Sequence, residues 1–136
     1  MVNNSGITMK FLVVDDLPTM RRVVRSALNR IGYDDIIEAE DGVAALQKLK
    51  DNEVDIILTD WSMPNMDGLD LVKTIRSNQN KYRNIPILMI TVKGNHEDVV
   101  EAIRAKVNGY IVKPFTPLIL QDKIDAILKI MKNNIP

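Results

Sequence analysis

The run KFLVVDD (residues 10–16) decides the fold class, because a short apolar segment ends in two adjacent carboxylates. Four more short runs rich in Val and Ile follow it along the chain: residues 35–39 (DIIEA), 55–59 (DIILT), 85–91 (IPILMIT) and 109–112 (GYIV). Three of the five runs lack polar alternation, which is typical of parallel strands covered on both faces. The sequence therefore predicts five short, buried strands.

Segments with helical periodicity alternate with these strands. In residues 18–31 the apolar residues recur at the spacing of one helical face: Met20, Val23, Val24, Ala27, Leu28 and Ile31. Pro18 suits the first turn of that helix, and Gly32 is a natural stop. Further helices are predicted over residues 42–50, 69–77, 95–106 and 117–132. Five β–α units in sequence predict an α/β fold of the flavodoxin-like (βα)5 type: a doubly wound, five-stranded parallel sheet with helices on both faces.

Composition excludes several classes of function. The 136 residues carry 18 Lys plus Arg and 18 Asp plus Glu, and a net charge of zero argues against non-specific nucleic-acid binding. The absence of cysteine excludes disulfides, thiol catalysis and zinc–thiolate sites. No apolar run approaches the ~20 residues of a membrane span, and residues 1–8 lack the layout of a signal peptide. We expect a cytoplasmic protein with no membrane partner, a flexible lead-in at residues 1–9 and one domain at residues 10–132.

Chemically reactive side chains follow four of the predicted strands. Asp15 and Asp16 follow the first, Asp60 the third, Thr91 ends the fourth, and Lys113 follows the fifth. Ligands of such folds bind outside the carboxyl ends of the strands, where these groups would converge. Several carboxylates held together favour either proton uptake or a cation, and Mg²⁺ prefers oxygen ligands. Such a cluster suits phosphoryl transfer, in which a carboxylate can be the nucleophile.

Each of these residues also has an ordinary structural interpretation. Asp15 and Asp16 could cap the helix at Pro18, Asp60 could be a turn residue, and Lys113 could be a solvated surface lysine. Their joint occurrence at four strand ends favours a functional site. A structural ion-pair cluster remains the alternative from the residues alone.

Four motifs in order resemble the receiver domains of two-component response regulators, and among these most closely the chemotaxis group. They are residues 11–16 (FLVVDD), 59–68 (TDWSMPNMDG), 90–91 (IT) and 109–116 (GYIVKPFT). Residues 19–22 (TMRR), 60–61 (DW) and 113–116 (KPFT) are typical of the chemotaxis group. The resemblance covers residues 10–131.

The resemblance implies the role of each site residue. Asp60 would be the phosphoacceptor, taking its phosphoryl group from a kinase histidine. Mg²⁺ would bind Asp16, Asp60 and the backbone carbonyl of Ser62, with Asp15 acting through water. Lys113 would contact the phosphoryl group.

A conformational switch is implied as well. Thr91 would turn toward the phosphoryl group and Tyr110 would move inward, while the Lys113–Pro114 bond would be cis. Trp61, beside Asp60, would report on the site by fluorescence. The helix from Asn95, the strand at Tyr110 and the last helix would form the output face.

The loop after Thr91 departs from the pattern of the chemotaxis group. The loop after Thr91 reads Val92, Lys93, Gly94, whereas similar regulators carry a small, an acidic and a small residue there. We expect these residues to alter the lifetime of the aspartyl phosphate and the output. Lys106 and Val107 also stand where small residues are common. Binding to a flagellar motor switch protein or an auxiliary phosphatase is therefore open.

The leading hypothesis is a monomeric, single-domain response regulator of chemotaxis or flagellar motor control, a phosphoacceptor rather than an enzyme, partnered by a chemotaxis-type histidine kinase. One alternative is a phosphate sink or relay that does not bind the motor switch. Alternatives of other classes are a Mg²⁺-dependent phosphohydrolase, which would need a substrate cap, and a flavodoxin-like cofactor binder, whose flavin phosphate Asp15 and Asp16 would repel.

Overall fold

The computed structural model describes residues 8–77 and 81–133. Strands and helices alternate along the chain: β1 (Lys10–Val14), α1 (Pro18–Arg30), β2 (Asp35–Ala39), α2 (Gly42–Asp51), β3 (Ile56–Thr59), α3 (Gly68–Ser77), β4 (Ile87–Thr91), α4 (His96–Arg104), β5 (Gly109–Val112) and α5 (Pro117–Asn133). Residues 1–7 of the predicted lead-in lie outside the described residues. Met9, its last residue, is buried in the core.

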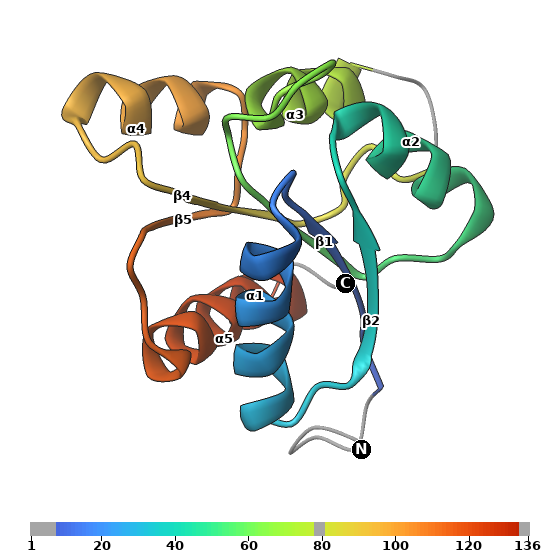
Figure 1. Ribbon diagram of the computed structural model, residues 1–136, viewed down its shortest axis with the longest axis vertical. Helices are drawn as coiled ribbons and strands as arrows, with labels where there is room; N and C mark the ends of the chain where they lie inside the picture. The colour runs from blue at the N-terminus through green and yellow to red at the C-terminus, as the bar shows by residue number, and fades with distance from the viewer. Residues whose placement is uncertain (1–7, 78–80, 134–136) are drawn as a thin grey trace.

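The five strands form one parallel sheet in the order β2-β1-β3-β4-β5. Helices α1 and α5 lie together against one face, and α2, α3 and α4 cover the other (Figure 1). The predicted doubly wound α/β fold is confirmed. Its strand order reverses between β1 and β3, so that the carboxyl ends of these two strands flank the switch point where such folds bind ligands.

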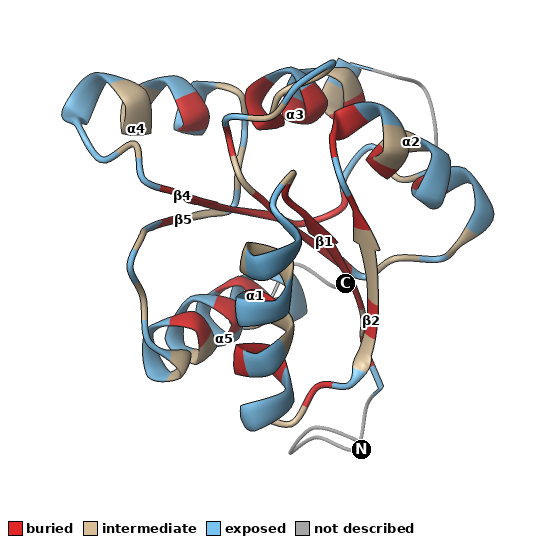
Figure 2. Cartoon of the chain, viewed as in Figure 1, coloured by how far each residue is buried: buried red, intermediate tan, exposed pale blue. Residues whose placement is uncertain are grey.

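Successive side chains of a strand point to opposite faces of the sheet. Because helices cover both faces, each strand contributes side chains to two buried layers. Phe11 and Val13 of β1 pack in the layer with α1 and α5, whereas Leu12 and Val14 pack in the layer with α2 and α3. Figure 2 shows the central strands β1, β3 and β4 buried, the edge strands β2 and β5 only partly buried, and the helices buried along their inward sides. Burying one such side chain contributes about 1.5–3 kcal/mol, so the continuous apolar runs stabilise both layers at once.

Two strands begin later than predicted, and each difference has a local cause. Asp55 lies outside β3: its carboxylate accepts a hydrogen bond from the backbone N–H of Lys10 at 2.8 Å, and its side chain is exposed. Ile85 and Pro86 precede β4, since Ile85 donates its N–H to Tyr82 in a turn and Pro86 has none to donate.

Helix α4 is shorter than the predicted 95–106 at both ends. Asn95 is its N-cap, accepting a hydrogen bond from the N–H of Asp98 at 2.8 Å. At the other end, Lys106 has a φ of 78°. A left-handed residue closes a helix rather than extending it.

Candidate functional site

Two carboxylates and one ammonium converge at the carboxyl edge of the sheet. The Nζ atom of Lys113, after β5, lies 3.0 Å from Oδ2 of Asp60 and 3.2 Å from Oδ2 of Asp15. The three side chains are only 8%, 13% and 4% exposed, respectively. The structure thus brings together three of the predicted site residues. Any two of them are at least 45 positions apart in the sequence.

Backbone hydrogen bonds orient both carboxylates. The N–H of Trp61 donates to Oδ1 of Asp60 at 2.6 Å, and the N–H of Leu17 donates to Oδ1 of Asp15 at 3.0 Å. The backbone of Asp60 is itself tied to β1, because its N–H donates to the carbonyl of Val14. Each carboxylate therefore keeps one oxygen on the backbone and directs the other to Lys113.

Burial raises the pKa of the Asp15 carboxyl, and the nearby Asp60 charge adds to the rise. The N–H of Leu17 and the ammonium of Lys113 act in the opposite direction but do not cancel the effect of burial. The favourable contacts with Leu17 and Lys113 thus do not offset the desolvation of this carboxylate. A further cation at this edge would favour its charged form.

Gly68 makes the approach of α3 to the site possible. A Cβ atom on Gly68 would lie 1.9 Å from the carbonyl oxygen of Asp60, and the N–H of Gly68 donates to the carbonyl of Trp61 at 2.7 Å. The turn over residues 61–67 thus returns the chain directly onto the Asp60 backbone. The sequence shows Gly68 as part of the motif at residues 59–68 but does not reveal this steric requirement.

The predicted switch residues Thr91 and Tyr110 are linked through Lys93. Thr91 is fully buried, and its Oγ1 accepts a long 3.4 Å hydrogen bond from the N–H of Lys93. The hydroxyl of Tyr110 donates to the carbonyl of Lys93 at 2.6 Å. Burial, followed by the charges of Asp98 and Asp60, raises the pKa of Tyr110 to about 12, so the hydroxyl remains a donor at neutral pH.

Lys93 also reaches the residue next to Asp60. Its ammonium lies 4.9 Å from the centre of the Trp61 ring, and Trp61 is buried, at 5% exposed. The other two residues of this loop, Val92 and Gly94, are exposed. The sequence indicated that Lys93 lies beside the site, but not that it contacts an aromatic ring.

The two remaining residues of the predicted metal set lie nearer to solvent. Asp16 is half-buried and the Ser62 side chain is exposed. Among residues 8–77 and 81–133, no three acidic, His or Cys side chains cluster closely enough to hold a metal ion. Asp15 and Asp60, however, converge on one ammonium, and Mg²⁺ usually takes only one or two protein carboxylates together with waters. The oxygen donors therefore fit Mg²⁺, but not a metal ion that takes all of its ligands from protein side chains.

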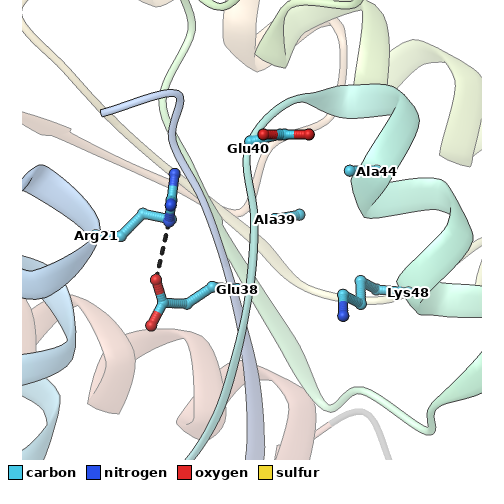
Figure 3. A pocket seen from close by; sticks show the side chains of 6 residues that line it. All are labelled: Arg21, Glu38, Ala39, Glu40, Ala44 and Lys48. Atoms are coloured by element: carbon cyan, nitrogen blue, oxygen red, sulfur yellow. Dashed lines mark hydrogen bonds and ion pairs between the residues drawn. The ribbon is translucent and has the colours of Figure 1, made fainter. Parts of the chain in front are cut away.

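Arg21 is a residue at this edge that sequence reasoning missed. Its guanidinium donates to the backbone carbonyl of Asp15 at 2.6 Å and to Oε1 of Glu38 at 2.9 Å. Figure 3 shows the Arg21–Glu38 pair in a pocket at the end of β2, with Lys48 on the opposite wall. Burial raises the pKa of Glu38, but hydrogen bonds from Arg25 and Arg21 outweigh it and hold the pKa below its ordinary value. The charged Glu38 thus fixes the arginine that holds the Asp15 carbonyl.

The Lys113–Pro114 peptide bond is cis, as the resemblance implied. None of the described helices is long and apolar enough to cross a bilayer.

Comparison with known proteins decides the family. The model of the response regulator receiver domain matches residues 11–125. The chain belongs to this family. It is 51% identical over 121 residues to the chemotaxis protein CheY1 of Helicobacter pylori, covering 88% of this chain and 97% of that protein. It is 50% identical to a chemotaxis protein CheY homolog of Campylobacter jejuni, with 88% and 92% covered.

A solved structure supports the same assignment. The chemotaxis protein CheY4 of Vibrio cholerae superposes with a TM-score of 0.81 at 35% identity, covering 89% of this chain and 99% of that one. The receiver-domain family that the four motifs implied is therefore confirmed, as is the fold predicted from the five β–α units.

Proposed function

We propose that this receiver domain acts as a response regulator that accepts a phosphoryl group on Asp60 from a histidine kinase, with Mg²⁺ as cofactor. The observation that carries the proposal is the convergence of Asp60 and Asp15 on Lys113 at 3.0 and 3.2 Å. A fixed nucleophile beside a fixed cation is what phosphoryl transfer requires, because its catalysis consists mainly of positioning and charge neutralisation.

In the proposed reaction, a carboxylate oxygen of Asp60 attacks the phosphorus of a phosphohistidine. The new O–P bond forms as the N–P bond breaks, and the imidazole leaves with the bonding electron pair. The Trp61 N–H holds one oxygen of Asp60 and restricts rotation of the carboxylate. Lys113, already within hydrogen-bond distance, neutralises charge on the transferred group.

Asp16, Asp60 and the Ser62 carbonyl would hold Mg²⁺, with Asp15 contributing through water. The ion would supply the positive charge that the buried carboxylates and the incoming phosphoryl oxygens require. The contact of both Asp15 and Asp60 with the one ammonium of Lys113 supports this requirement, because two carboxylates there share a single positive charge.

Signalling would follow from the link between Thr91 and Tyr110. If Thr91 turns toward the phosphoryl group, the Lys93 N–H loses its acceptor on Oγ1, and the same residue carries the carbonyl that holds the Tyr110 hydroxyl. Phosphorylation would thus release or move Tyr110, and a two-state element biased in this way is sufficient for signalling.

A role in chemotaxis is supported by the similarity of the chain to chemotaxis proteins of Helicobacter, Campylobacter and Vibrio. Its partners would be a chemotaxis-type kinase in the cytoplasm and, as output, a flagellar motor switch protein, with an auxiliary phosphatase ending the signal. The loop Val92, Lys93, Gly94 is the part of the chain that would distinguish this output from a phosphate sink or relay.

The direct test is intact-mass spectrometry after incubation with acetyl phosphate, with and without Mg²⁺. The wild type should gain one phosphoryl group only with Mg²⁺, and Asp60→Asn should gain none. Asp125→Asn, which removes an exposed carboxylate from α5, should behave as the wild type does. Equal labelling of Asp60→Asn, or labelling that is independent of Mg²⁺, would refute the proposal.

Output requires a separate measurement. Binding of a purified flagellar motor switch protein is measured with and without beryllofluoride, which mimics the phosphoryl group on an aspartate. A gain in affinity on activation supports the motor role. Equal, weak binding in both states favours the sink or relay.

A further inference from the structure

A groove of about 450 Å³ lies between α3 and α4. Four cationic side chains and one carboxylate line it: Lys73, Arg76, Arg104, Lys106 and Glu101. The carboxyl ends of α3 and α4 meet there, next to the beginnings of β4 and β5. Asp60 and Lys113 follow the carboxyl ends of β3 and β5. The groove, beside the starts of β4 and β5, is thus at the opposite edge of the sheet.

The positive charge of this groove is only partly neutralised within the described part of the domain. Across residues 8–77 and 81–133, none of the four cations lies within ion-pairing distance of a carboxylate. Glu101 offsets one charge, and the carboxyl ends of the two helices together offset about one more. The groove therefore retains roughly two positive charges in a chain whose formal net charge is zero.

Arg76 forms a rigid floor for the groove. All five of its N–H groups donate to neutral acceptors: the carbonyls of Lys106, Arg83 and Ile85 and the side chain of Asn108. Burial lowers the pKa of its guanidinium, with no carboxylate contact to oppose the effect. A half-buried, fully hydrogen-bonded but unpaired cation fixes positive potential at this position.

Lys106 at the rim occupies a backbone conformation that favours glycine. Its φ is 78°, and its N–H and that of Val107 donate to the carbonyls of Ile103 and Ala102, which closes α4 as a Schellman motif. A lysine in this position is strained where glycine would not be. Two hydrogen bonds from Arg76 to the Lys106 carbonyl hold the strained residue in place. The exposed side chain of Lys106 thus has a fixed starting point at the rim of the groove.

We propose that the groove between α3 and α4 is a docking site for an acidic segment of a partner protein, with two or more carboxylates spanning Lys73, Arg104 and Lys106. Charge complementarity carries this assignment. The volume exceeds that of a single phosphate ion, and the aliphatic stems of the lysines and arginines offer apolar walls to a peptide. A nucleic acid would require a broad positive face, which a domain of zero net charge does not provide.

The position of the groove separates this interaction from the proposed phosphorylation. A segment bound beside the starts of β4 and β5 leaves the Asp60 edge open, so docking does not require the phosphoryl group and does not block its transfer. The domain could therefore stay tethered to a partner through a complete cycle of phosphorylation.

The test is fluorescence anisotropy with a fluorescein-labelled hexaglutamate peptide at low and at high NaCl. The wild type should bind saturably at low salt and more weakly at high salt. Lys73→Gln with Arg104→Gln should weaken binding between about twofold and thirtyfold, the range that two exposed ion pairs provide. Lys123→Gln with Lys129→Gln removes the same number of exposed charges from α5 and should leave binding unchanged.

Lys106→Gly provides a second, independent variant. It should weaken peptide binding yet raise the urea midpoint of unfolding, because it removes both the charge and the backbone strain. Asp60→Asn should bind the peptide as the wild type does, which separates this site from the phosphoacceptor. The proposal fails if the α5 control weakens binding as much as the groove variants, if the peptide does not bind, or if an oligothymidylate of six nucleotides binds more tightly than hexaglutamate.

Discussion

The ammonium of Lys93 lies 4.9 Å from the centre of the Trp61 ring. This contact joins the loop after β4 to the residue next to Asp60. Because the carbonyl of the same lysine accepts the Tyr110 hydroxyl, one residue connects the candidate phosphoacceptor with the candidate switch. Removal of the Lys93 side chain should therefore be detected at Trp61.

Lys93→Gln should change the wavelength of the Trp61 emission maximum, because the charge beside the ring is lost. It should also destabilise the fold by about 0.5–1 kcal/mol, the strength of a cation–π contact near the surface. The measurement is fluorescence-detected urea unfolding. Lys123→Gln on α5 is the matched control, and should change neither quantity. An unchanged emission maximum in Lys93→Gln would show that the ammonium does not contact the ring in solution.

Asp15→Asn should stabilise the domain at neutral pH. Burial raises the pKa of this carboxyl, so the folded state binds a proton more tightly than the unfolded state does. The charged form therefore destabilises the fold above the folded pKa, and the penalty disappears as pH falls below the unfolded value. An asparagine can still accept the Leu17 N–H without carrying the charge.

Urea unfolding of wild type and Asp15→Asn, followed from neutral to acidic pH without Mg²⁺, measures this effect. The two curves should converge as the solution becomes acidic. A lower stability of Asp15→Asn at pH 7 would mean that its pairing with Lys113 outweighs desolvation.

Gly68→Ala should disrupt the site, because its Cβ would lie 1.9 Å from the carbonyl oxygen of Asp60, a backbone atom that cannot rotate away. We expect a loss of roughly 3 kcal/mol or more. Gly94→Ala is the control, since the atoms nearest to its Cβ would be side-chain carbons of Val112, the closest at 3.1 Å, and not backbone atoms. Thermal unfolding should separate the midpoints of the two variants by several degrees, and equal midpoints would contradict the close packing of Gly68 on Asp60.

Asp41→Ala should cost roughly 2 kcal/mol of stability. Asp41 is buried and caps α2 by accepting the N–H of Ala44 at 2.8 Å, and its second oxygen accepts a hydrogen bond from Asn65 at 2.7 Å. Asn95→Ala removes a cap with one such bond, to Asp98, and should cost about 1 kcal/mol. Urea unfolding of the two variants compares the free energy lost with a cap that accepts two hydrogen bonds and with a cap that accepts one.

The same cap predicts a pH dependence. The N–H of Ala44 and the amide of Asn65 hold the pKa of Asp41 below its ordinary value of 3.8. Its contribution to stability is therefore complete above the unfolded pKa and is lost as pH falls through the lower folded pKa. Asp41→Asn lacks this titration, so the stability difference between wild type and Asp41→Asn should shrink below about pH 3.8. A difference that is constant with pH would exclude the carboxylate as its source.

The sequence by itself determined the order and type of the elements and which side chains follow the strands. Apolar runs such as residues 10–14 and the periodicity of residues 18–31 are local signals. A strand buried on both faces leaves a continuous apolar run, whereas a helix buried on one face leaves apolar residues every three or four positions. Since all parallel strands end at one edge, the meeting of Asp15, Asp60 and Lys113 followed from the same pattern.

The tertiary structure alone decided which groups contact each other at the site and elsewhere. Arg21 on the Asp15 carbonyl, Lys93 on Trp61 and Arg76 on Lys106 join residues 6, 32 and 30 positions apart. Nothing in the composition or periodicity indicates these pairs, because long charged side chains are found exposed on most helices and loops and their partners depend on how the elements pack. Packing also decided that Gly68 must lack a side chain, since only the fold brings the start of α3 onto the backbone of Asp60.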